Sequence, residues 1–340
     1  MQKGLVSLLT PMYNARHNVH RLLDSVLRQT YPRIEMIVID DGSTDNSSDI
    51  VSSYISRFQA RGYTLRCVRQ ENSGQSVAIK NGLQMVHGEF LAWPDSDDFY
   101  AADEAIEKMV NVLTHADEEF QMVRTQETFV EEETLAPITI KGQHAHEEED
   151  SSLFYDCLYA KNDYYYCPGA YMVRTEKLYE VTHFDIYTDK DAGQNLQLWL
   201  PILYKYRCKT ILEPLYKVVV RKESHSRGQY KGFEAIKKRY ASYFLTTVET
   251  LRRIGMPQDE IELHAQRIST GYNHRLFSVA ILERKVEEAH KLYEMLKEQR
   301  ANGLSEDIVM FTARSMRLPL LALLLMKMRK CIPLHYTLHI

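Results

Sequence analysis

Two kinds of hydrophobic pattern alternate along the first part of the chain. Short, continuous apolar runs predict buried strands, and apolar residues spaced three and four positions apart predict helices between them. Strands are expected at residues 5–10, 35–41, 65–69 and 89–94. Helices are expected at residues 19–27, 50–58, 75–86 and 106–113. This alternation predicts a Rossmann-like α/β fold with a mainly parallel sheet.

The last third of the chain has an almost entirely helical pattern. Before it, residues 196–206 predict a helix and residues 211–220 predict a strand. Further helices are expected at residues 233–253, 259–268, 284–298 and 305–330. We therefore expect two domains, an α/β domain over residues 1–230 and a helical C-terminal region over residues 231–340.

The composition is that of a globular protein, with 340 residues, 44% hydrophobic and 26% charged. A net charge of −4 gives no basic field, so no nucleic-acid partner is expected. The five cysteines are scattered without a CxxC pair, which predicts reduced thiols in a cytoplasmic protein. The longest apolar run, residues 318–326, is about half of a membrane-spanning helix.

Polar residues follow three of the predicted strands, at residues 10–14, 40–43 and 95–98. In parallel α/β sheets, ligands bind beyond the carboxyl ends of the strands. These three strand ends are therefore expected to form one binding site.

The acids at residues 95–98 are candidate metal ligands. Alternating carboxylates can present hard oxygens to one Mg²⁺ or Mn²⁺ ion. The alternative is a surface turn that caps the next helix, but the position at a strand end favours the metal site.

The other two segments offer nucleotide contacts. An acid at Asp40 or Asp41 can accept a hydrogen bond from a ring N–H or a ribose hydroxyl, although a capped turn explains the same residues. After the third strand, Asn72 supplies a donor and Lys80 can neutralise phosphate, or the segment is an ordinary loop and helix start. His225 lies in a basic stretch that suits a diphosphate or a metal, and equally a solvated loop.

The motifs resemble the family 2 glycosyltransferases, which have the nucleotide-sugar-binding GT-A fold. The matching stretches occur in the family's order and spacing: TPMYN at 10–14, residues 25–47, QENSG at 70–74, KNG at 80–82 by position, HGEF at 87–90 and DSDD at 95–98. The resemblance is close over about residues 4–100 and loose over about residues 160–228. It implies a GT-A glycosyltransferase domain over residues 1–230.

The resemblance also implies an activity and a set of binding residues. A sugar would pass from a nucleotide-diphosphate donor, a UDP-sugar, to an acceptor hydroxyl with inversion, in cell-surface polysaccharide or glycoconjugate synthesis. Asp97 and His225 would bind a divalent cation, Mn²⁺ or Mg²⁺, and Asp41 would accept from uracil. The donor-binding set carried over by position is Thr10, Pro11, Tyr13, Asp41, Asn72, Lys80, Asp95 and Ser96.

One departure from the family pattern concerns the catalytic base. Many inverting members carry a Glu-Asp pair where this chain has Gln194 and Asn195, and an amide cannot remove a proton. Asp191, the nearest acid before the predicted helix, is the candidate base, with Asp189 as the other choice. The alternative is a protein that binds nucleotide sugars without turnover. A nucleotidyltransferase is disfavoured because the first strand is followed by no glycine-rich phosphate loop.

The apolar run at residues 318–326 is flanked by cations, including Arg317 and Lys327. Such a segment predicts contact with the inner face of a membrane, beside a lipid-linked glycan acceptor. A buried core helix is the alternative.

Overall fold

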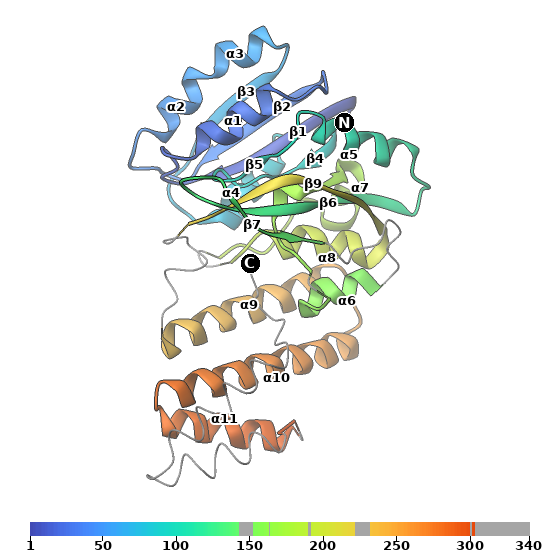
Figure 1. The fold of residues 1–340 in the computed structure, drawn as a ribbon. Coiled ribbons are helices and arrows are strands. Elements are labelled where there is room, and N and C mark those ends of the chain that lie inside the picture. The colour runs from blue at the N-terminus through green and yellow to red at the C-terminus, as the bar shows by residue number, and fades with distance from the viewer. Residues whose placement is uncertain (143–151, 163, 190–191, 222–231, 300, 303–340) are drawn as a thin grey trace. The chain divides into compact units, whose positions relative to one another are not determined.

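The computed structural model describes residues 1–142, 152–162, 164–189, 192–221, 232–299 and 301–302 (Figure 1). These residues fall into two compact units. One unit comprises the described residues up to Arg221 together with Glu249–Ile254, and the other comprises Gly232 to Val248 and the described residues from Gly255 onward. The predicted domain boundary at residue 230 lies outside the described residues and stays a prediction.

The first unit is built on one mixed sheet (Figure 1). In the described part of the chain it has nine strands, in the order β3-β2-β1-β4-β8-β6-β9-β5, with β7 paired to β6. Its first four strands run parallel, as predicted. They are β1 (Gln2–Met12), β2 (Ile34–Asp40), β3 (Thr64–Arg69) and β4 (Gly88–Ala92).

Burial explains why these strands form and where they end. All seven residues of β2 are buried, as expected for a central parallel strand covered on both faces. Its register with β1 pairs Leu8 with Met36 and Met12 with Asp40. The carboxyl ends of β1 and β2 are therefore level, and the residues that follow them meet at one edge of the sheet.

The remaining strands add mostly antiparallel pairs. Strand β8 (Tyr171–Arg174) lies antiparallel between β4 and β6 (Phe120–Glu131), and β5 (Phe99–Tyr100) lies antiparallel to β9 (Arg207–Val220). Strand β7 (Pro137–Lys141) pairs with β6. The sequence pattern does not predict β6, because its buried positions include Arg124 and Glu127, and charged side chains are ordinarily assigned to the surface.

Helices connect these strands. The predicted helix over residues 50–58 is two short helices that meet at Tyr54, and the hydroxyls of Ser52 and Ser53 donate to helical carbonyls there. The helices are α1 (Val19–Leu27), α2 (Ser47–Ser53), α3 (Ile55–Ala60), α4 (Gln75–Leu83), α5 (Ala105–His115), α6 (Ser152–Tyr159), α7 (Thr175–Thr182) and α8 (Asn195–Lys205), with a 3-10 turn at Pro168–Ala170.

The second unit is helical, which confirms the predicted helical C-terminal region. Helices α9 (Phe233–Arg253), α10 (Gln258–Leu282) and α11 (Val286–Glu298) follow one another, and the last turn of α9 belongs to the first unit. The unit has a core of its own, made of Phe233, Leu276, Phe277, Ala280, Ala289, Leu292 and Leu296.

The predicted helix over residues 305–330 and its apolar run lie outside the described residues. Among the helices that are described, none combines the length and apolar character needed to cross a bilayer.

Candidate functional site

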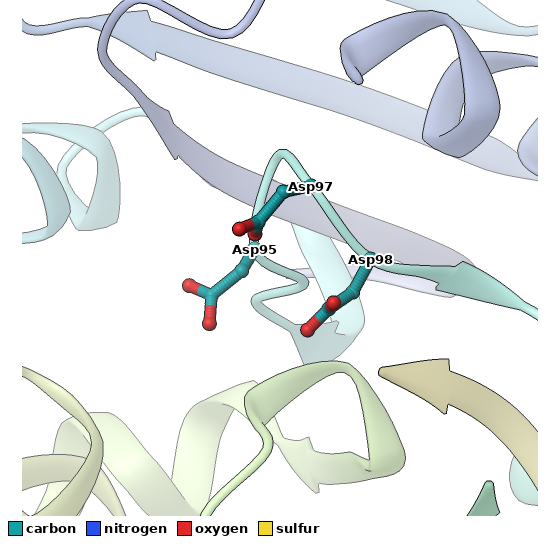
Figure 2. Close-up of side chains that lie close together, drawn as sticks. All are labelled: Asp95, Asp97 and Asp98. Carbon is teal, nitrogen blue, oxygen red and sulfur yellow. The ribbon is translucent and has the colours of Figure 1, made fainter. Parts of the chain in front are cut away.

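Three aspartates lie together just beyond the end of β4 (Figure 2). Asp95, Asp97 and Asp98 each offer a carboxylate oxygen, and these atoms lie within 4.8 Å of one another. Figure 2 shows the three side chains directed to the same side of their loop. Asp98 is buried, whereas Asp95 and Asp97 are partly exposed. Hard oxygens in this arrangement suit a divalent cation such as Mg²⁺ or Mn²⁺.

The electrostatics of this acid cluster also favour a cation. Although Asp95 keeps some exposed surface, the loss of solvent around its carboxylate raises its pKa to about 8, with the Asp97 charge adding to the rise and Arg221 opposing it. Burial and the charge of Asp97 hold the pKa of Asp98 well above its ordinary value. Since neighbouring carboxylates resist joint ionisation, a bound divalent cation would stabilise their charged forms.

The end of strand β9 and the residue after it contact two of the three acids. The backbone N–H of Val219 donates to Asp98 Oδ1 at 2.8 Å. One residue beyond the strand, Arg221 forms an ion pair with Asp97. Asp98 is one of the acids predicted as candidate metal ligands, whereas Arg221 was expected only as part of the basic stretch after residue 220.

Asp41 binds the loop that follows β3. Its Oδ1 accepts from Gln70 Nε2 at 2.8 Å and from the Ser73 N–H at 2.9 Å, and its Oδ2 accepts from the Gly74 N–H at 2.9 Å. A carboxylate has about four acceptor positions, so these three bonds leave room for one more donor. The predicted contact with a uracil N–H is compatible with this count.

Its neighbour Asp40 is structural. Asp40 is fully buried, accepts from the Ser43 N–H at 2.8 Å and pairs with Arg69 at 3.2 Å. Gly42 is required in the same turn, since its φ is +75° and a Cβ there would lie 2.8 Å from the Asn72 nitrogen. The sequence offered Asp40 and Asp41 equally as nucleotide contacts. In the structure Asp40 is engaged within its own turn and with Arg69, and Asp41 is the remaining candidate.

The predicted nucleotide contacts from β1 differ in exposure. Thr10 is fully buried within the strand and Pro11 is also buried, whereas Tyr13 lies beyond the strand with 43% of its surface exposed. Asn72 is exposed, and Ser96 is partly exposed between two acids of the cluster. Of this set, Tyr13, Asn72 and Ser96 are open to a ligand.

Lys80 has a carboxylate partner. Its Nζ lies 2.6 Å from Asp185 Oδ1, and Arg253 pairs with the other oxygen of Asp185 at 2.5 Å. The ion pair with Asp185 already provides a counter-charge for Lys80, so the lysine does not by itself indicate a phosphate site. The predicted phosphate contact stays a prediction.

The segment that leads to the predicted base lies beside the acid cluster. Ser76 Oγ donates to the carbonyl of Asp189 at 2.9 Å and accepts from its N–H at 3.3 Å. The preceding residue, Gln75, donates to Asp95 Oδ1 at 3.2 Å. The start of α4 thus joins residue 189 to the cluster. Asp191 and His225 lie outside the described residues.

The two amides at the start of α8 are buried. Asn195 Oδ1 accepts from Trp93 Nε1 at 3.3 Å, and its Nδ2 donates to the Tyr166 carbonyl at 3.1 Å. Gln194 is 1% exposed, and its Nε2 has no hydrogen-bond partner among the described residues. An ionised aspartate at residue 195 could accept from Trp93 but could not donate to Tyr166, whereas the amide does both.

Comparison with known proteins assigns the family. A model described as "Glycosyl transferase family 2" matches residues 7–182, just over half of the chain. The chain therefore belongs to the family 2 glycosyltransferases, as its motifs predicted.

Two curated relatives carry names consistent with this class. A putative teichuronic acid biosynthesis glycosyltransferase, TuaG of Bacillus subtilis, is 39% identical over 111 residues, which are 33% of this chain and 42% of TuaG. An uncharacterised glycosyltransferase of Rickettsia typhi is 31% identical over 152 residues, or 44% of this chain and 45% of the relative. The matched regions span less than half of the length of these relatives.

Solved structures confirm the GT-A fold. Residues 1–349 of Staphylococcus aureus TarS, in complex with UDP-GlcNAc, have a TM-score of 0.65 and 17% identity, covering 96% of this chain and 92% of that chain. The mannosyltransferase PcManGT of Pyrobaculum calidifontis, in complex with GDP-Man and Mn²⁺, has a TM-score of 0.52 and 16% identity, covering 96% and 86%. At these identities the likeness establishes the fold alone.

Proposed function

We propose that this glycosyltransferase moves a sugar from a UDP-sugar to a hydroxyl of a glycan or lipid-linked acceptor, in polysaccharide or glycoconjugate synthesis. The acid cluster at the end of β4 carries the proposal, because a metal-binding group at this edge of the sheet suits a diphosphate. The UDP-GlcNAc bound to TarS and the acceptor positions of Asp41 support a uridine donor.

In this proposal Asp97 and Asp95 bind the divalent cation, and His225 is a further ligand. The cation, Mn²⁺ or Mg²⁺, supplies positive charge to the leaving diphosphate. Asp98 orients the loop through its bond from Val219. Tyr13 and Asn72 contribute exposed groups to the donor site.

The proposed base is Asp191, which would take the proton of the acceptor hydroxyl in a single displacement with inversion. The bonds between Ser76 and Asp189 support a base in this segment, since they join residue 189 to the start of α4. Asp189 is the second candidate.

The test is a screen of nucleotide sugars for nucleotide release, with and without Mn²⁺. We expect Asp97→Ala to lose metal-dependent turnover. The variant should stay folded, because the Asp97 carboxylate is partly exposed and is not part of the hydrophobic core. Asp103→Asn is the control, since Asp103 is an exposed acid paired with Arg28 outside the cluster. Near wild-type turnover in Asp97→Ala would refute the metal assignment.

A second candidate function is nucleotide-sugar binding without turnover, favoured by the structural role of the amide at residue 195. Calorimetric binding of a donor with no nucleotide release, in wild type and Asp191→Asn alike, would support it. Loss of release in Asp191→Asn with retained donor binding would support the transferase and its base.

A further inference from the structure

Arg221 pairs with one of the three acids that are proposed to bind the cation. Strand β9 pairs antiparallel with β5, Phe99 with Lys217 and Tyr100 with Tyr216, and Arg221 directly follows the last residue of β9. The guanidinium accordingly reaches the acid cluster and pairs with Asp97 through one terminal nitrogen.

The hydrogen bonding of Arg221 is incomplete. Its Nε is buried and finds no acceptor among the described residues. A buried donor without an acceptor lowers the free energy of unfolding. An arginine with a purely structural role ordinarily has acceptors for its guanidinium N–H groups. The spare donor suits an anion that arrives with the substrate.

A bound metal and the Arg221 guanidinium would share the Asp97 carboxylate. Asp97 is one of the three acids whose oxygens lie within 4.8 Å of one another, and one of its oxygens already accepts from Arg221. A divalent cation bound between these acids would be repelled by the guanidinium charge at this short range.

We propose that Arg221 is a positioning residue that holds Asp97 in the metal-free protein and transfers to the diphosphate when the nucleotide binds. Arg221 then opposes metal binding in the absence of nucleotide, and the nucleotide removes this opposition. Metal and nucleotide therefore bind cooperatively, by the reciprocity of linked equilibria. This inference rests on the proposed function, since it takes the acid cluster as the metal site.

The experiment is a Mn²⁺ titration of the full chain, followed by electron paramagnetic resonance, with and without UDP. Without UDP, Arg221→Gln is expected to bind Mn²⁺ about three- to tenfold tighter than wild type, because a competing charge is lost. Arg221→Lys, which keeps a charge, should stay close to wild type. Arg16→Gln is the matched control, since Arg16 is an exposed cation whose guanidinium donates to His17.

The response to UDP completes the test. UDP should tighten Mn²⁺ binding in wild type by a larger factor than in Arg221→Gln. Equal or weaker Mn²⁺ binding in Arg221→Gln without UDP would overturn the inference. So would a result in which UDP tightens Mn²⁺ binding by the same factor in wild type and in Arg221→Gln. A purely structural Arg221 predicts a lower melting temperature with unchanged Mn²⁺ affinity.

The same data separate this inference from the proposed function. Mn²⁺ binding by wild type with UDP, together with no gain in Arg221→Gln, refutes the inference alone. Absence of Mn²⁺ binding in every protein, even with UDP, refutes the proposed metal site and the inference with it.

Discussion

Asn195 stands where the resemblance to the family predicts an acid. The departure has a physical reason, since the amide both accepts from Trp93 and donates to Tyr166 in a buried environment. Trp93 lies two residues before Asp95, so the amide fixes the strand end that carries the acid cluster. Residue 195 therefore supports the site without ionising.

Asn195→Asp is expected to destabilise the protein by about 1–3 kcal/mol and to give no gain in transfer. The carboxylate would face the Tyr166 carbonyl, and a buried charge would be left without a donor there. Urea unfolding and a transfer assay check this. A large gain in transfer would contradict this prediction and would indicate that an acid at residue 195 can act as the catalytic base.

Asp41 is expected to give uridine nucleotides preference over adenine nucleotides. The uracil N3–H donates a hydrogen bond, whereas the corresponding adenine N1 accepts one and would be repelled by the carboxylate. Calorimetry with UDP and ADP measures the preference, which Asp41→Asn should reduce.

The control for Asp41 is Asp49→Asn, because Asp49 is an exposed acid in the first turn of α2. Equal affinity for UDP and ADP in wild type would refute the role of Asp41. So would a preference that Asp41→Asn leaves unchanged.

At the scale of elements, the buried Glu35 side chain contacts groups on or next to three other strands. Glu35 on β2 accepts from Ser7 Oγ on β1 at 2.6 Å and from the His87 N–H before β4 at 2.7 Å, and it pairs with Arg66 on β3 at 3.2 Å. Burial acts to raise the pKa of Glu35, but the bonds from Ser7 and His87 outweigh it and lower the pKa below its ordinary value.

A lowered folded-state pKa means that Glu35 stabilises the protein above its unfolded-state pKa, about 4.3, and loses this effect as the pH falls through the folded value. Glu35→Gln should therefore cost about 1–3 kcal/mol at neutral pH and much less in acid. Urea unfolding across this range measures the difference, with the exposed Glu71→Gln as control. A cost independent of pH would contradict the ionic role.

At the scale of the whole molecule, each unit has its own core. The helical unit buries Phe277, of which 2% is exposed, among the side chains of α9, α10 and α11. We therefore expect a disturbance of this core to leave the parallel strands of the first unit protected.

Phe277→Ala should destabilise the helical unit by about 3–5 kcal/mol through the cavity it leaves. Hydrogen exchange is expected to show lost amide protection in α10 and α11 and retained protection in β1 and β2. Leu282→Ala is the control, because Leu282 is 55% exposed. Equal loss of protection in β1 and β2 would show that the two units unfold together.

The sequence alone determined the parallel strands and the strand ends that carry the acids. Continuous apolar runs such as residues 35–39 are characteristic of strands buried on both faces, and the residues after them must meet at one sheet edge. The family followed from motifs that are local in sequence, such as DSDD. These features depend on near neighbours along the chain, which is why a pattern predicts them.

The tertiary structure alone decided which polar groups are partners. Arg221 meets Asp97, 124 residues earlier in the chain, and Lys80 meets Asp185 across 105 residues. Strand β6 escaped prediction because its buried charges are stabilised by groups from other strands, such as Thr210 on β9, which accepts from Arg124 at 3.0 Å. No local pattern encodes such partners, since the energy of a buried charge depends on groups that only the folded chain brings beside it.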